Sequence, residues 1–272
     1  MKIFSRLFTG CLCALAAVIL CPLCEAAERI VILAPAAADI VEKLGAGAEV
    51  VGKCDSIDEF PSARKVGTHI NPSIEIIASL KPTVIISTAR FTSEQAARTG
   101  AERWMYAPES IDAIPGEVLK LGKRLKREKE AAAIEKSIEE KLAAVTLPKS
   151  KTTALFEVRS NPLSLAGQNT VASSALVAAG MQNMFGLQRT SSVSPEFVLS
   201  SAPDYYIYQE GPMNLNPVPP LKRNGWERLD SCIIKLDEKV FSRPNTDIFD
   251  TVIKLNRILN SENPCETEII NE

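Results

Sequence analysis

A charged, helix-favouring segment, residues 110–145, divides the chain into two parts that follow the same pattern. The segment has no β-like run, and from Lys120 to Leu142 it is dense in Lys, Glu, Ala and Leu. On each side of it, short apolar runs rich in β-branched residues alternate with helical runs, which is typical of a parallel sheet covered by helices. The sequence therefore predicts an α/β fold with two lobes, each built on a central parallel sheet, joined by one long helix.

The linking segment has its own start and stop signals. Ser110 suits a helix N-cap, and Pro148 closes the segment. A continuous helix of about 34 residues would be roughly 50 Å long, which is enough to join two lobes. Its apolar stripe lapses near residues 126–130, so a break there stays open, but no second long helix is expected to pair with it. The predicted units are residues 28–110 for the N-terminal lobe, 111–147 for the linking helix, 148–260 for the C-terminal lobe and 261–272 for a flexible tail.

The alternation gives approximate bounds for each element. In the first lobe the expected strands are 29–34, 49–52, 83–87 and 103–107, and the expected helices are 35–44, 73–80 and one beginning near residue 92. In the second lobe the expected strands are 153–158, 204–208 and 232–236, and the expected helices are 171–179, 194–201 and 247–259.

Residues 1–27 have the layout of a secretory signal peptide. Two basic residues precede an uncharged, mostly apolar run, Leu7–Leu23, and small residues follow it. A transmembrane anchor is the alternative, but the run is short for a bilayer and contains Gly and Pro. Lipidation at Cys21 or Cys24 is disfavoured because leucine precedes both. We expect export to the periplasm through a cleaved signal peptide, without a lipid anchor.

Composition excludes several function classes. The formal net charge of −2 gives no reason to expect nucleic acid as a partner. No Gly-x-Ser-x-Gly, Walker A or Gly-x-Gly-x-x-Gly pattern is present, and the chain has 1 histidine, so we expect no enzyme. After the signal peptide the cysteines are Cys54, Cys232 and Cys265. This odd number leaves at least one free thiol or one intermolecular bond.

Several short motifs recur in a fixed order. The first lobe carries Val50-Val51-Gly52, Phe60-Pro61, Val66-Gly67 and the run Ser73–Ile86 (SIEIIASLKPTVII), and the second carries Val193–Leu199, Ala202-Pro203-Asp204, Gly225-Trp226 and Phe241–Pro244. In this order and spacing they resemble the helical-backbone class (class III) of periplasmic binding proteins, which serve importers for vitamin B12, ferric siderophores and haem. The resemblance covers nearly all of the chain after the signal peptide. It implies two Rossmann-like lobes with a ligand cleft between them.

The resemblance also implies a function. It suggests the substrate-binding protein of an ABC importer, a monomer without an intrinsic cofactor. Such a protein would capture an iron- or cobalt-containing chelate (cobalamin or another corrinoid, haem or a ferric siderophore) and deliver it to a permease dimer with its cytoplasmic ATPase. Two alternatives stay open: a binding protein for a small oxyanion such as molybdate, and an extracytoplasmic sensor of the same fold.

Glu75 and Glu196 lie near the starts of corresponding helices in the two lobes. Acidic residues at such positions favour the helix dipole in any protein. In the resembled family, equivalent acids project from the lobe tips and meet arginines of the permease, so we expect a docking role for this pair.

The remaining candidates fall on loops expected at the cleft. In haem-binding relatives a tyrosine falls near Thr68 and ligates iron. That tyrosine is absent here, which leaves His69 as a candidate ligand to iron or cobalt, although a lone loop histidine is more often merely solvated. The other candidate ligand-binding residues are Arg90, Arg159 and Arg243 for carboxylates or phosphate, and Phe241 and Trp226 for stacking on a flat macrocycle.

Overall fold

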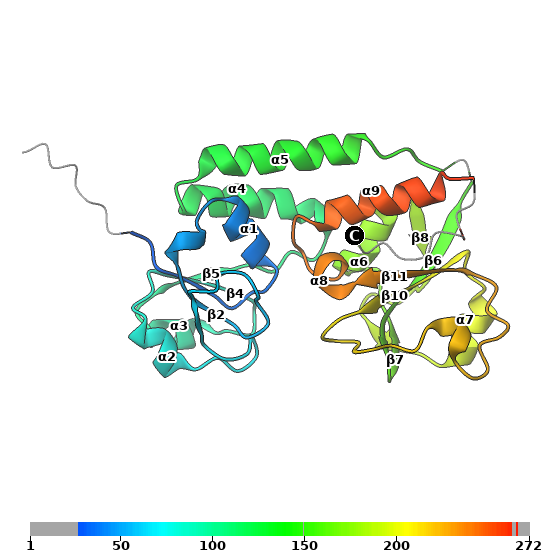
Figure 1. Ribbon diagram of the computed structural model, residues 1–272, viewed down its shortest axis with the longest axis horizontal. Coiled ribbons are helices and arrows are strands. Elements are labelled where there is room, and N and C mark those ends of the chain that lie inside the picture. The colour runs from blue at the N-terminus through cyan, green and yellow to red at the C-terminus, as the bar shows by residue number, and fades with distance from the viewer. Residues whose placement is uncertain (1–26, 149, 263–264, 266–272) are drawn as a thin grey trace, which may run out of the picture.

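Two α/β lobes lie side by side, and helices run along one edge of the molecule (Figure 1). The computed structural model describes residues 27–148, 150–262 and 265. The predicted signal peptide, apart from its last residue, and most of the predicted tail therefore lie outside the described residues. Within those ranges, none of the helices combines the length and the apolar character that crossing a bilayer requires.

The N-terminal lobe is built on a parallel sheet with strand order β3-β2-β1-β4-β5. Its two central strands consist of β-branched residues without solvent exposure, as expected for strands covered on both faces. Gly52 lets the end of α2 pack on the sheet, because a Cβ there would lie 2.8 Å from Leu80 Cδ1. The elements are β1 (Ile30–Ile32), α1 (Ala37–Lys43), β2 (Val50–Lys53), β3 (Arg64–Lys65), α2 (Ile74–Ser79), β4 (Val84–Ser87), α3 (Ser93–Ala97) and β5 (Glu102–Met105), with a 3-10 turn at Gly47–Glu49.

The C-terminal lobe has a mixed sheet with the order β11-β10-β6-β7-β9, and β8 also pairs with β6. Strands β6, β10 and β11 are parallel, as predicted, whereas β7 and β9 add an antiparallel extension on the other side of β6 that was not predicted. Both edge strands are too short for a periodic signal. The elements are β6 (Thr152–Ser160), β7 (Leu163–Leu165), α6 (Val171–Ala178), β8 (Met181–Asn183), β9 (Ser191–Ser192), α7 (Pro195–Ser201), β10 (Tyr205–Glu210), β11 (Cys232–Asp237), α8 (Glu238–Phe241) and α9 (Ile248–Leu259), with a 3-10 turn at Pro220–Lys222.

The linking segment differs from the single long helix that was expected. A 3-10 turn (Ile111–Ala113) leads into α4 (Ile114–Arg124), and the chain then folds back into α5 (Glu128–Ala143), which lies against α4 (Figure 1). The turn falls where the apolar stripe lapses, with Lys126 at φ 57°. The helices pack closely because Gly122 has no side chain; a Cβ there would lie 2.3 Å from that of Ala131. The segment thus pairs with itself, and α5 alone, about 24 Å long, leads to the second lobe.

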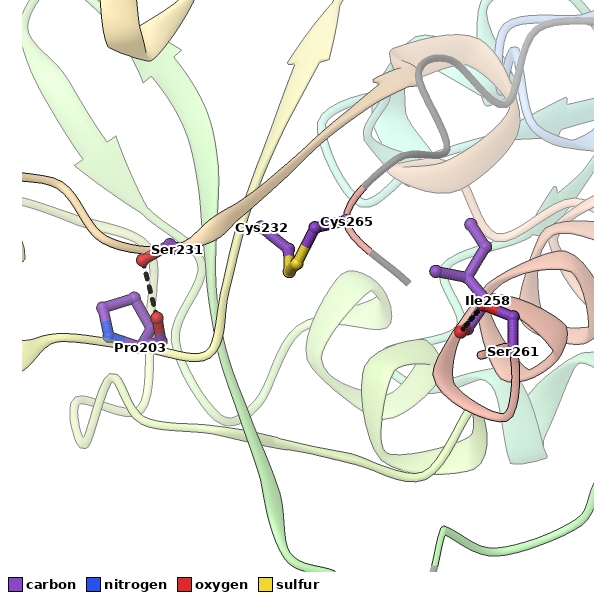
Figure 2. The surroundings of a disulfide bond; sticks show 6 residues. All are labelled: Pro203, Ser231, Cys232, Ile258, Ser261 and Cys265. Atoms are coloured by element: carbon purple, nitrogen blue, oxygen red, sulfur yellow. Dashed lines mark hydrogen bonds between the residues drawn. A yellow bond between two sulfur atoms is a disulfide. The ribbon is translucent and has the colours of Figure 1, made fainter. Parts of the chain in front are cut away.

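A disulfide bond ties the segment after α9 back to the second lobe. Cys232 at the start of β11 is bonded to Cys265, with their Cα atoms 4.8 Å apart (Figure 2). Cys265 was expected in a free tail, and this bond corrects that expectation at this residue. Cys54 is a free thiol, one of the two outcomes that the odd number of cysteines allowed, and it is buried.

A group of polar contacts, which we call the clasp, fastens the second lobe to the first. The Asp39 carboxylate on α1 accepts hydrogen bonds from Thr246 N and Oγ1, both 2.7 Å away. The Lys43 ammonium lies 2.6 Å from Asp39 and 2.5 Å from Asp247. Partial burial opposes the charge of Lys43, but its hydrogen bonds to Asp247 and Asp39 outweigh burial and raise its pKa. Tyr106 adds a hydrogen bond of 2.5 Å to the Pro244 carbonyl.

We predict that Asp39→Ala lowers the free energy of unfolding by about 2 to 3 kcal/mol, because it removes the acceptor of a charge-assisted pair of hydrogen bonds and leaves Thr246 N without its partner. Urea unfolding followed by circular dichroism measures the change. Glu42→Ala, an exposed acid on the same helix, is the matched control and should change stability by less than about 0.5 kcal/mol. Equal effects of the two substitutions would contradict the role given to the clasp.

Candidate functional site

Segments that follow strands of both sheets meet at the boundary between the lobes. Lys239, just after β11, forms an ion pair of 2.5 Å with Asp58, which follows β2. The clasp joins the same two regions. In open α/β sheets, ligands bind outside the carboxyl ends of the strands. This boundary is therefore the candidate ligand site.

His69 lies in a tight turn that follows β3. Gly67 opens the turn at φ 100°, where a Cβ would lie 2.9 Å from the Asn71 carbonyl oxygen. The Thr68 hydroxyl accepts a hydrogen bond of 3.0 Å from Asn71 N, so it helps to shape the turn. His69 itself is partly buried. The backbone that carries the His69 imidazole is therefore held in one conformation by the turn.

Two arginines act on this imidazole. Burial lowers the pKa of His69, and the positive charges of Arg243 and then Arg90 lower it further. Arg90 follows β4 in the first lobe, whereas Arg243 comes from the second, so the fold brings three of the predicted residues together from both lobes. A lowered pKa keeps the imidazole neutral near pH 7, which is the form that ligates metals. The guanidinium groups suit carboxylates or phosphates.

Two other candidates from the sequence relate differently to this group. Arg159 is exposed near the end of β6 and is not among the charges that act on His69. Cys54 is buried, which raises the pKa of its thiol despite its contact with Ser56 and the nearby charge of Arg243. Its sulfur lies 3.5 Å from Ser56 Oγ. Cys54 is therefore a protonated thiol packed behind the boundary.

The loop 211–222 after β10 was missed by the sequence reasoning. Its apolar side chains are exposed: Met213 by 49%, Leu215 by 76%, Val218 by 54% and Leu221 by 55%. The loop lies near Arg243, because Met213 N donates a hydrogen bond of 2.5 Å to Glu238, and Arg243 approaches the same carboxylate at 3.9 Å. A cluster of apolar residues between prolines was the only sequence signal. Together with His69, Arg90 and Arg243, this loop forms what we call the boundary site.

Buried polar side chains hold the loop in place. Asn214 accepts hydrogen bonds of 2.9 and 2.8 Å from Ser160 N and Oγ, and donates one of 2.7 Å to the Gln209 carbonyl. At the far end, Arg223 Nε donates to the Val218 carbonyl at 2.8 Å. Asn214 thus faces inward and anchors the loop, whereas Met213, Leu215, Val218 and Leu221 are exposed.

Arg223 in turn belongs to a buried network. Its guanidinium lies 2.5 and 2.8 Å from the two oxygens of Glu157, which has no solvent exposure. Tyr206 donates a hydrogen bond to the same carboxylate, and burial raises the pKa of this tyrosine. Burial opposes the charge of Arg223, but the hydrogen bonds to Glu157 outweigh it and raise the pKa. The network therefore fixes the position of Arg223, just after the end of the loop.

The two aromatic residues expected to stack on a ligand are core residues instead. Phe241 is fully buried, with its ring centroid 5.2 Å from that of Phe156. Trp226 is 4% exposed; Arg223 lies 4.8 Å from its ring centroid, and Tyr206 meets it edge-on at 5.4 Å. Their ring faces are occupied by protein, so the expectation of stacking is wrong for both.

The predicted docking acids lie on α2 and α7, and both helices face the side of the molecule opposite α4 and α5 (Figure 1). Glu75 is 3.5 Å from Arg98, an ion pair of two largely exposed side chains. Glu196 is also exposed, and hydrogen bonds from its own backbone N–H and the Ser194 hydroxyl lower its pKa. Both carboxylates are therefore accessible to a partner.

An apolar hollow of about 450 Å³ lies beside α7, away from the lobe boundary. It is lined by Phe185, Gly186, Leu187, Val193, Ser194 and Phe197. Among the described residues, no group of three or more His, Cys, Asp or Glu side chains could hold a metal ion.

Comparison with known proteins places the chain among binding proteins. Residues 30–218 match the family model described as "Periplasmic binding protein". No curated protein sequence matches the chain.

Solved structures share the fold at low sequence identity. A periplasmic haem-binding protein from Roseiflexus sp. RS-1 is 23% identical, with a TM-score of 0.72 over 86% of this chain and 98% of that one. A periplasmic haem-binding protein of Vibrio cholerae is 16% identical, with a TM-score of 0.74 over 87% and 100%. A periplasmic vitamin B12-binding protein of Vibrio cholerae is 18% identical, with a TM-score of 0.66 over 86% and 98%.

We predict that the pKa of His69 lies below 6.5 and rises toward that value in Arg243→Gln, because the substitution removes a nearby positive charge. As the sole histidine of an untagged chain, its imidazole is unambiguous in an NMR titration. Arg159→Gln is the matched control and should leave the pKa unchanged.

The same shift has a consequence for stability. The folded pKa lies below the unfolded value, so the unfolded state binds more protons and stability falls as pH drops through about 6.5. His69→Gln should remove this part of the acid sensitivity. A pKa that does not move in Arg243→Gln would show that the two side chains are not neighbours.

Proposed function

The chain belongs to the periplasmic binding protein family, and we propose that it captures an iron- or cobalt-containing chelate and delivers it to the permease of an ABC importer. Family membership implies an extracytoplasmic protein that hands a small molecule to a transporter. One observation carries the choice of ligand: the boundary site combines cationic side chains, a neutral imidazole and an exposed apolar loop. Haem, cobalamin and ferric siderophores are the ligands considered.

The charged half of the site suits acidic groups on the ligand. Arg90 and Arg243 approach His69 from different lobes, so a bound anion would bridge the lobes. Arginine binds carboxylate and phosphate groups through paired hydrogen bonds. Haem propionates, acidic siderophore groups and the cobalamin phosphate all have this chemistry. The imidazole of His69 would then be available to the metal of the cargo.

The apolar half of the site suits the body of a macrocycle. Four exposed apolar side chains on one loop form a surface that soluble proteins usually cover with a partner or ligand. Because Asn214 and Arg223 fix the backbone of the loop, binding requires little ordering of the chain. The haem- and vitamin B12-binding proteins of similar fold support a ligand of this size.

A small oxyanion such as molybdate is the second candidate. Arg90, Arg243 and backbone amides could bind it, but it would leave the apolar loop uncovered. The two candidates therefore differ in whether the loop contributes to affinity. An extracytoplasmic sensor of this fold would bind the same ligand without supporting uptake.

For the partner, we propose a permease dimer with a cytoplasmic ATPase, which the protein would meet as a monomer. The helices α2 and α7, which carry Glu75 and Glu196, lie on the same side of the molecule, one in each lobe (Figure 1). Two exposed carboxylates on matching helices suit a two-fold partner that offers two cations. Such rim charges act on association rate and orientation more than on raw affinity.

We predict that at least one of haem, cobalamin and a ferric siderophore raises the melting temperature of the purified protein, whereas molybdate does not. With the chelate that binds, Leu215→Ser combined with Val218→Ser should weaken affinity about tenfold or more, since two apolar contacts are lost. Leu147→Ser, which alters a residue 73% exposed near the end of α5, is the matched control. A rise in melting temperature with molybdate and with none of the chelates would contradict the proposed chelate and identify the ligand as an oxyanion.

We also predict that Glu75→Arg combined with Glu196→Arg abolishes uptake while ligand affinity stays unchanged, because the tips lie away from the boundary site. Transport into proteoliposomes containing the permease and ATPase measures the first effect, and titration calorimetry measures the second. Glu130→Arg with Glu139→Arg, which makes the same charge change on exposed positions of α5, should transport normally. Lost ligand affinity in the tip variant would mean that these acids belong to the ligand site.

A further inference from the structure

The hollow beside α7 is an apolar surface that the proposed ligand site does not use. Its floor is Phe185, which is 3% exposed, and its walls include Phe197 and Leu187, which are 38% and 54% exposed. The two phenylalanine rings meet edge-on at 5.8 Å, so the wall is held in a fixed orientation. A rigid, exposed apolar concavity is the form that binding surfaces take on soluble proteins.

Gly186 keeps this hollow open. A Cβ built at Gly186 would meet no atom within 4 Å, and its φ lies outside the left-handed region. Neither packing nor backbone conformation therefore requires glycine at this position. A larger side chain would occupy the hollow without disturbing the fold.

The carboxylate of Glu196 lies at the rim of the hollow. The Ser194 hydroxyl, which lines the hollow, donates a hydrogen bond to Glu196. Among residues 27–148, 150–262 and 265, no cation forms an ion pair with Glu196, whereas Glu75 in the other lobe has Arg98 beside it. A partner that complements this surface would offer an apolar side chain next to a basic one.

We propose that the hollow beside α7 receives an apolar side chain of the permease, next to the basic residue that pairs with Glu196. This inference rests on the proposed transport function, because the hollow lies on the side of the molecule that is proposed to dock on the permease. The arrangement matches protein interfaces in which an anchor residue enters an apolar pocket surrounded by polar contacts.

The test measures binding of the mature protein, without ligand, to its permease–ATPase complex in lipid nanodiscs by biolayer interferometry. Gly186→Leu fills the hollow and should raise Kd about tenfold or more, as should Phe197→Ser, which removes a wall. Gly116→Leu is the matched control: it adds the same side chain at an exposed glycine of α4 where a Cβ also meets no atom. Its Kd should equal that of the unaltered protein. Circular dichroism melting confirms that each variant folds.

The outcomes separate this inference from the function on which it rests. If the unaltered protein does not bind the nanodiscs, docking itself fails, and both proposals fall. If it binds and Gly186→Leu binds equally well, the hollow has no role in docking and only this inference is overturned. Equal binding to empty nanodiscs would assign the hollow to lipid. Self-association that Gly186→Leu abolishes, with permease affinity unchanged, would assign it to a second copy of the chain.

Discussion

The hydrogen bonds between Asp39 and Thr246 are the contact on which the arrangement of the two lobes depends. They hold the segment between α8 and α9 against the first lobe, and Arg243 lies three residues before Thr246. Tyr106 holds the same segment through the Pro244 carbonyl, so these contacts together bring the charge of Arg243 to where it acts on His69. The linking helices alone would set only an approximate distance between the lobes. The carboxylate fixes their register, and the neighbouring ammonium of Lys43 lies 2.6 Å from it.

Much of the fold followed from local patterns, and the exceptions share a physical cause. Buried parallel strands such as β1 and β4 consist of β-branched residues, and caps such as Ser73 mark helix starts. The hairpin of α4 and α5 was not predicted because it depends on Gly122 meeting Ala131, a contact between residues of opposite helices. Tertiary packing of small residues has no periodic signal. The same limit applies to β7 and β9, whose pairing is set by their neighbours.

The candidate site divides in the same way. The family resemblance pointed to His69, and loop position pointed to Arg90, Arg159 and Arg243, since loops after parallel strands gather at one edge of a sheet. Of these three arginines, Arg90 and Arg243 are the ones whose charges act on His69. Position was not enough for Phe241 and Trp226, because whether an aromatic ring near a strand end faces ligand or core is decided by distant partners. The loop 211–222 was missed for the converse reason. Its apolar residues resemble core residues in sequence, and only the buried side chains that anchor the loop leave them outside.

That loop exposes four apolar side chains above buried polar anchors, and this arrangement bears on function. Burying Glu157 and Arg223 costs desolvation that a well-packed apolar pair would avoid. Exposing Leu215 and its neighbours forgoes the burial that stabilises a fold. Neither the buried ion pair nor the exposed apolar side chains help the unliganded protein to fold. Together they fix an apolar surface beside cationic groups that come from both lobes. A surface of this kind lowers free energy only when something covers it, so the stability of the loop conformation is best understood together with the molecule that binds there.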